Sequence, residues 1–153
     1  FVREMFFAGR VRMQIVFIIL LGICAIYDLR SKTIPAMWIW GILGFTIVYR
    51  LTIIISGQGT ITNSLLCLIP GIFLLIISRC GKLVGSGDGW LIIAEGLFWE
   101  WTLLICVLVY SFLAAGLFSI GYLIMGHRDR KETIPFVPFL FVGMLIFVIG
   151  DLM

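Results

Sequence analysis

This sequence has little charge for its length. Only 12% of its residues are Asp, Glu, Lys or Arg, whereas a soluble domain is typically about a quarter charged. Hydrophobic residues make up 62% of the chain. The formal net charge of +3 is small and dispersed, so it does not favour nucleic acid as a partner. The composition indicates one membrane domain with no separate soluble domain.

The sequence also lacks the usual patterns of cysteine and histidine sites. It has four cysteines and one histidine, with no CxxC pair and no cysteine close to a histidine. This excludes a recognisable zinc site or disulfide framework. We expect no metal and no cofactor, and we interpret the cysteines as small buried residues in helices: Cys24, Cys67, Cys80 and Cys106.

Long apolar runs, by contrast, fill nearly the whole chain. They are separated by short polar breaks and cover Met13–Tyr27, Ala36–Ile55, Ile61–Ser78, Trp90–Met125 and Ile134–Met153. A hydrocarbon core about 30 Å thick needs roughly 20 helical residues. The fourth run is much longer than that, so it is predicted to fold back.

The predicted break in the fourth run is Trp99-Glu100-Trp101. A carboxylate between two indoles suits a membrane interface better than the bilayer centre. The result is an all-α polytopic membrane protein with six transmembrane helices. The fourth helix, from about Asp88 to Trp99, is expected to be short.

The positions of the basic residues along the chain support this topology. Six helices place one set of basic residues on a single membrane face, as the positive-inside rule prefers. They are Arg30, Lys32, Arg79, Lys82, Arg128, Arg130 and Lys131. We divide the chain into an interfacial N-terminal segment, residues 1–12, and a six-helix domain, residues 13–153.

Two aspartates carry the predicted chemistry. Asp28 closes the first helix and Asp88 opens the fourth, so the six-helix topology places both at one membrane depth. Ionisable groups inside a membrane domain are candidate functional residues. Two adjacent carboxyls share a proton, so one can activate water while the other donates to a scissile carbonyl.

Glycines surround Asp88 in the string Gly85-Ser86-Gly87-Asp88-Gly89. Glycine permits close approach of another backbone, so Gly85, Ser86, Gly87 and Gly89 are predicted to bind an extended substrate strand. Simpler interpretations remain open at this point. Asp88 also fits the pattern of a helix N-cap residue, and Asp28 beside Arg30 also fits an interfacial salt bridge.

Other charged groups keep a different function open. Glu95 lies about two turns after Asp88 on one helix face. A small proton or cation transporter lined by Asp28, Asp88 and Glu95 is the alternative function. We otherwise expect Glu95 to face a water-filled cavity or a neighbouring polar group. The polar cluster 127–132 is interpreted as a solvated loop that also contacts anionic lipid headgroups.

Three motifs, in order, resemble those of the type IV prepilin peptidases and preflagellin peptidases, which are GxGD membrane aspartyl proteases. The first is Asp28 and Arg30 followed by Ile34-Pro35. The second is Gly85-Ser86-Gly87-Asp88. The third is Pro135-Phe136-Val137-Pro138-Phe139. The sequence departs from the family pattern at Ala36, where Asn is frequent, and at Val137, where Gly is usual.

This resemblance implies an aspartic endopeptidase of the cell membrane with its active site facing the cytoplasm. The substrates would be pilin-like precursors, cut after a short basic leader, and membrane lipids would be the other contacts. Asp28 and Asp88 would be catalytic, and Pro135, Phe136 and Pro138 would help to bind substrate. Nothing matches the CxxC-containing domain of longer members, so we expect peptidase activity without methyl transfer. The oligomeric state stays open.

Overall fold

The fold is described from a computed structural model of the chain. It describes residues 2–81, 85–124 and 135–152, with side chains placed for 12–80, 85–124 and 135–150. Lys82 and the polar cluster 127–132 lie outside the described residues, as do the side chains of residues 1–11. The prediction of an interfacial segment therefore stays a prediction.

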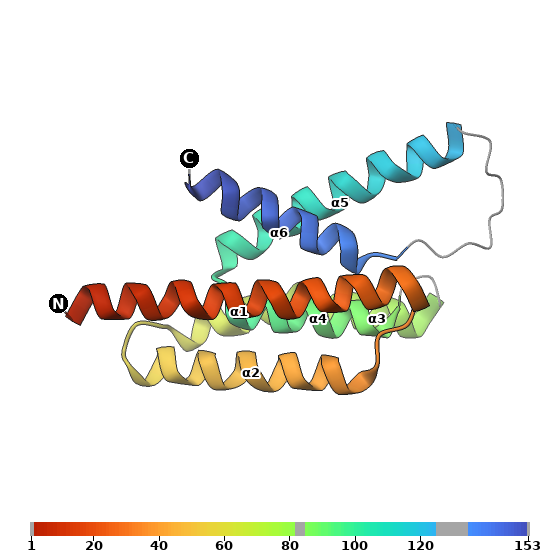
Figure 1. The fold of residues 1–153 in the computed structure, drawn as a ribbon. Coiled ribbons are helices and arrows are strands. Elements are labelled where there is room, and N and C mark those ends of the chain that lie inside the picture. The colour runs from red at the N-terminus through yellow and green to blue at the C-terminus, as the bar shows by residue number, and fades with distance from the viewer. Residues whose placement is uncertain (1, 82–84, 125–134, 153) are drawn as a thin grey trace.

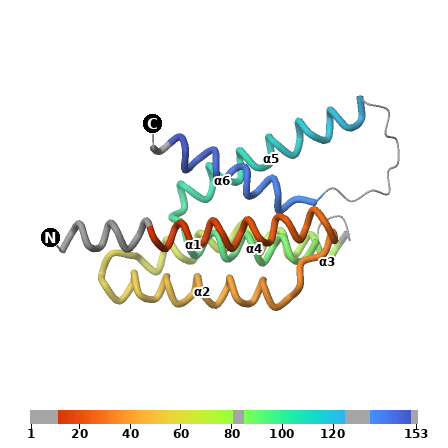
Figure 2. Tube along the Cα trace, viewed as in Figure 1, coloured from red at the N-terminus to blue at the C-terminus, as the bar shows by residue number. Residues whose placement is uncertain are grey.

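The described residues form six helices and are all-helical in character (Figure 1). The helices are α1 (Val2–Ser31), α2 (Ala36–Ile55), α3 (Ile61–Gly81), α4 (Ser86–Phe98), α5 (Trp101–Ile124) and α6 (Val137–Leu152). Successive helices α1 to α4 run in alternating directions, so the chain folds back at each turn (Figures 1 and 2).

Four of these helices are long and apolar enough to cross a membrane. The candidate spans are Arg12–Ser31, Ala36–Ile55, Ile61–Cys80 and Trp101–Ile124. This arrangement fits a multi-pass membrane protein. The helices α4 and α6 have only 13 and 16 residues, so the count of six membrane-spanning helices stays a prediction.

The predicted break in the fourth apolar run is confirmed. Helix α4 ends at Phe98 and α5 begins at Trp101, while Glu100 lies exposed between them. At 1.5 Å per residue α4 is roughly 20 Å long, shorter than the hydrocarbon core. The helix is nevertheless buried along most of its length, because neighbouring helices cover it.

Glycines allow α3 and α4 to pack with their backbones close together. A Cβ atom on Gly71 of α3 would collide with the side chain of Ile93 on α4. One on Gly96 of α4 would collide with the carbonyl oxygen of Cys67 on α3. Small residues at such contacts are how helices associate in a membrane, where burial of apolar surface gives little driving force.

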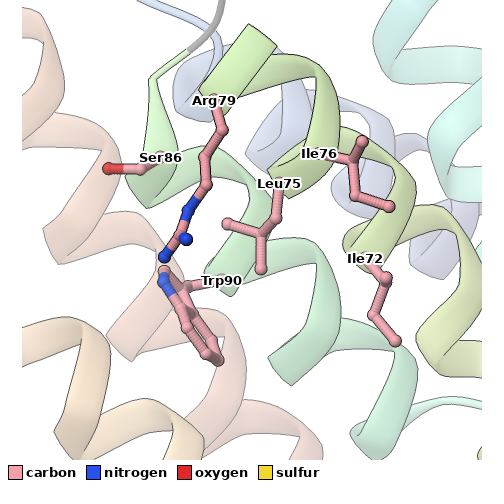
Figure 3. Close-up of a pocket in the computed structure, with 6 residues that line it drawn as sticks. All are labelled: Ile72, Leu75, Ile76, Arg79, Ser86 and Trp90. Atoms are coloured by element: carbon pink, nitrogen blue, oxygen red, sulfur yellow. The ribbon is translucent and has the colours of Figure 1, made fainter.

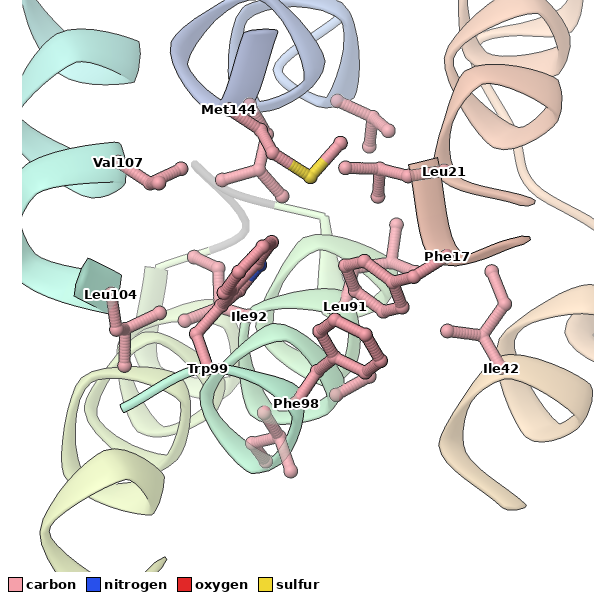
Figure 4. Packing of buried hydrophobic residues seen from close by; sticks show 14 of the residues in the cluster. Phe17, Leu21, Ile42, Leu91, Ile92, Phe98, Trp99, Leu104, Val107 and Met144 are labelled. Atoms are coloured by element: carbon pink, nitrogen blue, oxygen red, sulfur yellow. The ribbon is translucent and has the colours of Figure 1, made fainter. Parts of the chain in front are cut away.

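Phe98, at the end of α4, lies at the centre of an aromatic cluster (Figure 4). Its ring stacks on Phe17 of α1 at a centroid distance of 4.3 Å and on Tyr49 of α2 at 4.6 Å. Trp99 meets Phe98 edge-on at 5.1 Å. These contacts connect three helices, and Figure 4 shows Val107 and Met144 bringing α5 and α6 to the same core.

All four cysteines are free thiols. Cys24 and Cys67 are buried, which confirms their interpretation as core residues. Cys80 is exposed and Cys106 is intermediate, so the prediction of burial was wrong for Cys80. Cys80 occupies the last turn of α3.

Candidate active site

Asp28 and Asp88 lie at the same end of the helix bundle. Asp28 is in the last turn of α1, and Asp88 is in the first turn of α4. Figure 1 shows these two helix ends together, as the alternating helix directions require. The predicted arrangement of the two aspartates at one end of the bundle is therefore observed.

Asp28 is buried, with 6% of its surface exposed, and it is held by the start of α6. The backbone N–H of Val137 donates to its Oδ2 atom at 3.2 Å. Val137 is the first residue of α6, where a helix has unpaired N–H groups and a partial positive charge. The end of α1 is thereby joined to the beginning of α6.

The backbone that carries Asp28 is closed by a helix-ending turn. The N–H of Lys32 donates to the carbonyl oxygen of Asp28 at 2.9 Å, and Lys32 itself has a φ of 51°. A left-handed residue directly after a helix is a common way to end it. Pro35 then precedes α2 with an extended backbone, so α1 and α2 are separated by a short connection.

Asp88 is half-buried and is the third residue of α4. Its backbone N–H donates to the carbonyl oxygen of Gly85 at 3.2 Å, and its carboxyl group accepts a hydrogen bond from the Gly85 backbone. This is one half of a capping box, in which an acid in the first turn binds the backbone of the cap residue. The interpretation of Asp88 as a helix-terminus residue thus holds alongside the functional one.

The two carboxyl groups are near enough for the charge of Asp28 to act on Asp88. Each also accepts a backbone hydrogen bond at the N-terminal end of a helix, Asp28 at α6 and Asp88 at α4. Helix N-termini stabilise negative charge, so the fold offsets part of the cost of placing two acids together in an apolar protein. Two carboxyl groups that lie close together favour a single shared proton.

The glycine-rich string has an exposed part and a buried part. Gly85 and Ser86 are exposed, whereas Gly89 is buried against α3. A Cβ on Gly89 would lie 2.8 Å from the Leu75 side chain, so packing requires a glycine there. Gly87 is half-buried, and a Cβ there would lie 3.4 Å from Ile39 of α2. Gly85 and Ser86 are therefore the part of the glycine-rich string that is accessible from outside the protein.

The proline-phenylalanine segment begins α6 beside Asp28. Pro135, Phe136 and Pro138 are half-buried, and the Phe136 ring lies 5.2 Å from that of Phe112 on α5. The side chains of Pro135, Phe136 and Pro138 are the predicted substrate contacts of this segment. The backbone N–H of Val137 was not predicted as a contact of Asp28, although an unpaired N–H at the start of a helix is a predictable donor.

Glu95 differs from both aspartates. It is completely buried, and neither carboxylate oxygen has a hydrogen-bond partner among the described residues. The expectation that Glu95 faces a neighbouring polar group was therefore wrong within the part of the chain that the structure describes. Arg50 is another buried charged residue, and its guanidinium donates through Nε to Ser64 Oγ at 2.7 Å, between α2 and α3.

The chain is thus a helical, multi-pass type of membrane protein with a pair of carboxyls at one end of its bundle. The family model of the type IV leader peptidase family matches residues 15–120, and the chain belongs to this family of peptidases. The matched region includes Asp28 and Asp88 and ends before Pro135. No curated protein and no solved structure matches the chain.

Proposed function

We propose that this protein is an aspartic endopeptidase that removes the basic leader from pilin-like precursors at the cytoplasmic face of the cell membrane. Membership of the type IV leader peptidase family supports leader peptidase activity in general. The observation that carries the aspartic mechanism is that α1 and α4 bring Asp28 and Asp88 to the same end of the helix bundle.

The shared proton defines the chemistry of the pair. The ionised carboxyl takes a proton from water as the water oxygen attacks the scissile carbonyl carbon. The protonated carboxyl donates its proton to the carbonyl oxygen, which gives a gem-diol. Collapse of this intermediate breaks the C–N bond while the leaving nitrogen is protonated, and the products are a carboxylic acid and an amine. The two acids act as a unit, so we assign neither as the permanent base.

The basic residues support the orientation of the site. Arg30 and Lys32 follow Asp28 directly, and Arg79 ends α3 at the same end of the bundle. In membrane proteins, Lys and Arg are concentrated on the cytoplasmic side. We place the pair at the cytoplasmic face, with residues 13–153 as the peptidase domain and residues 1–12 in the interface.

The open part of the glycine string supports a place for substrate. Gly85 and Ser86 are exposed just before Asp88, and an extended chain there would pair with N–H groups at the start of α4. Phe136 and its flanking prolines would border the same site from α6, because Val137 contacts Asp28. A leader peptide that enters here meets both acids.

The test is cleavage by purified protein. A precursor whose leader ends in a basic residue and glycine is incubated with the wild type and with Asp88→Asn, and the products are mapped by mass spectrometry. The proposal predicts one cut directly after the glycine by the wild type and no cut by a folded Asp88→Asn. Cleavage at the wild-type rate by Asp88→Asn would refute the aspartic mechanism.

The transporter alternative requires a polar path leading away from the pair. Glu95 is the residue that would extend it, yet it has no hydrogen-bond partner among the described residues. Assays in liposomes distinguish transport from peptidase activity. Proton or cation flux that disappears in Asp28→Asn, without any cleavage of precursor by the wild type, would favour transport.

A further inference from the structure

A pocket of about 280 Å³ opens between α3 and α4 (Figure 3). Its lining combines one cation, one hydroxyl and four apolar side chains: Ile72, Leu75, Ile76, Arg79, Ser86 and Trp90. The volume is near the lower end of the roughly 300–1,000 Å³ typical of small-molecule sites. It therefore suits a compact group and a length of chain, not a folded protein segment.

The α3 side of the pocket is an apolar stripe that ends in a charge. Ile72, Leu75 and Ile76 precede Arg79 by seven, four and three residues, a spacing that places them on one helix face. Arg79 is in the last turn of α3, at the end of the candidate span Ile61–Cys80. The cation therefore lies at the membrane surface and the stripe runs inward from it.

The charge of Arg79 is available to a ligand. The residue is exposed, and no carboxylate of the described ranges pairs with its guanidinium. Figure 3 shows its side chain extending from α3 toward Trp90 on α4. Ile72 and Ile76 are 46% and 56% exposed, which leaves the apolar stripe accessible from the lipid side.

We propose that this pocket binds an anionic phospholipid, with the headgroup phosphate on Arg79 and one acyl chain along Ile72, Leu75 and Ile76. A guanidinium is suited to a phosphate because it offers several N–H donors in a fixed plane. The order of the lining, with charge at the surface and apolar groups below it, matches the order of a phospholipid. Ser86 brings the headgroup beside the turn that carries Asp88. Binding of the lipid does not depend on the proposed protease function.

The test is native mass spectrometry of the full chain in detergent with equal amounts of dioleoyl phosphatidylglycerol and dioleoyl phosphatidylcholine. The wild type should retain more phosphatidylglycerol. Arg79→Gln should lower the ratio of phosphatidylglycerol to phosphatidylcholine adducts about tenfold, as loss of a charge-assisted hydrogen bond predicts. The matched control is Arg30→Gln, which removes an exposed basic residue of α1 and should change the ratio by less than about twofold.

A second pair of variants tests the apolar stripe without changing the charge. Ile76→Trp fills the pocket and should reduce retention of phosphatidylglycerol, whereas Phe73→Trp, at an exposed position of α3 outside the lining, should not. Equal losses in Arg79→Gln and Arg30→Gln would overturn the proposal, since they would indicate general attraction to anionic lipid. Unchanged retention in Ile76→Trp, or full displacement of the lipid by excess inorganic phosphate, would overturn it as well, because either result would make the acyl chain irrelevant.

Discussion

The two ends of α4 hold acids in opposite surroundings. Asp88, in the first turn, is half-buried, accepts a backbone hydrogen bond and interacts with Asp28. Glu95, two turns later, is completely buried and has no hydrogen-bond partner among the described residues. A buried carboxylate without a partner is very costly, so the interior end suits only a neutral group.

This difference shows why a carboxyl in an apolar helix is not by itself a sign of function. Asp28 and Asp88 each accept a backbone hydrogen bond at the N-terminal end of a helix, which stabilises negative charge. Glu95 has no such hydrogen bond among the described residues. The comparison predicts separate effects on activity and on stability for the two ends.

The largest expected effect is on catalysis. Asp28→Asn, Asp88→Asn and the double variant should each lower the rate of precursor cleavage by at least about a thousandfold, and to a similar extent, because the acids act as a unit. Glu95→Gln should retain activity within about threefold of the wild type. Initial rates on one precursor give the comparison. A loss in Glu95→Gln as large as that in Asp88→Asn would contradict it.

The next effect is on packing at the interior end of α4. Gly96→Ala should lower the free energy of unfolding by about 1–3 kcal/mol, because its new methyl group would meet the backbone of Cys67. Gly116→Ala on α5 is the control, since a Cβ there meets nothing within 4 Å. It should be neutral or stabilise by up to about 1 kcal/mol through helix propensity. Thermal unfolding in detergent measures both, and equal stability of the two variants would argue against the close approach of α3 and α4.

Replacing Glu95 by an apolar residue should stabilise the protein. Glu95→Leu removes two unsatisfied oxygens at similar volume, which is worth about 1–2 kcal/mol. Glu95→Gln keeps a buried polar group and should differ little from the wild type. The same unfolding assay applies. If Glu95→Leu were clearly less stable than Glu95→Gln, the carboxyl would have a partner outside the described residues.

The smallest expected effect separates the structural role of Asp28 from its catalytic role. Asn retains a side-chain oxygen that accepts the N–H of Val137, whereas Ala does not. Asp28→Ala should therefore be about 1 kcal/mol less stable than Asp28→Asn, the usual value of a helix cap. Both variants should be inactive. Equal unfolding temperatures would mean that the contact between Asp28 and α6 contributes nothing to stability.

Much of this arrangement was predictable from local patterns. The length of the fourth apolar run and the Trp99-Glu100-Trp101 break predicted that this run folds back. The alternating direction of the helices then predicted that Asp28 and Asp88 lie at one end of the bundle. These features depend on segment length and hydropathy, which are properties of the sequence itself. Family membership was also predictable, because the first two motifs lie inside the matched region.

The details that required the structure are contacts between distant segments. The hydrogen bond from Val137 to Asp28 joins residues from the two ends of the chain, and no periodicity in the sequence indicates it. The lack of a hydrogen-bond partner for Glu95 among the described residues also required the structure, because it depends on every neighbouring helix at once. The packing of Gly89 against Leu75 likewise assigns a glycine of the motif to the α3–α4 contact.

The most direct test is to find the membrane side of the residues that flank the acid pair. In a variant with the four cysteines replaced by alanine, single cysteines are introduced as Lys32→Cys and Ser86→Cys, with Ser56→Cys at the opposite end of α2 as control. All three positions are exposed. In vesicles of one membrane orientation, a membrane-impermeant maleimide should label both Lys32→Cys and Ser86→Cys. It should label Ser56→Cys only in vesicles of the opposite orientation. Labelling of Lys32→Cys and Ser86→Cys from opposite sides would contradict the acid pair and the peptidase mechanism built on it.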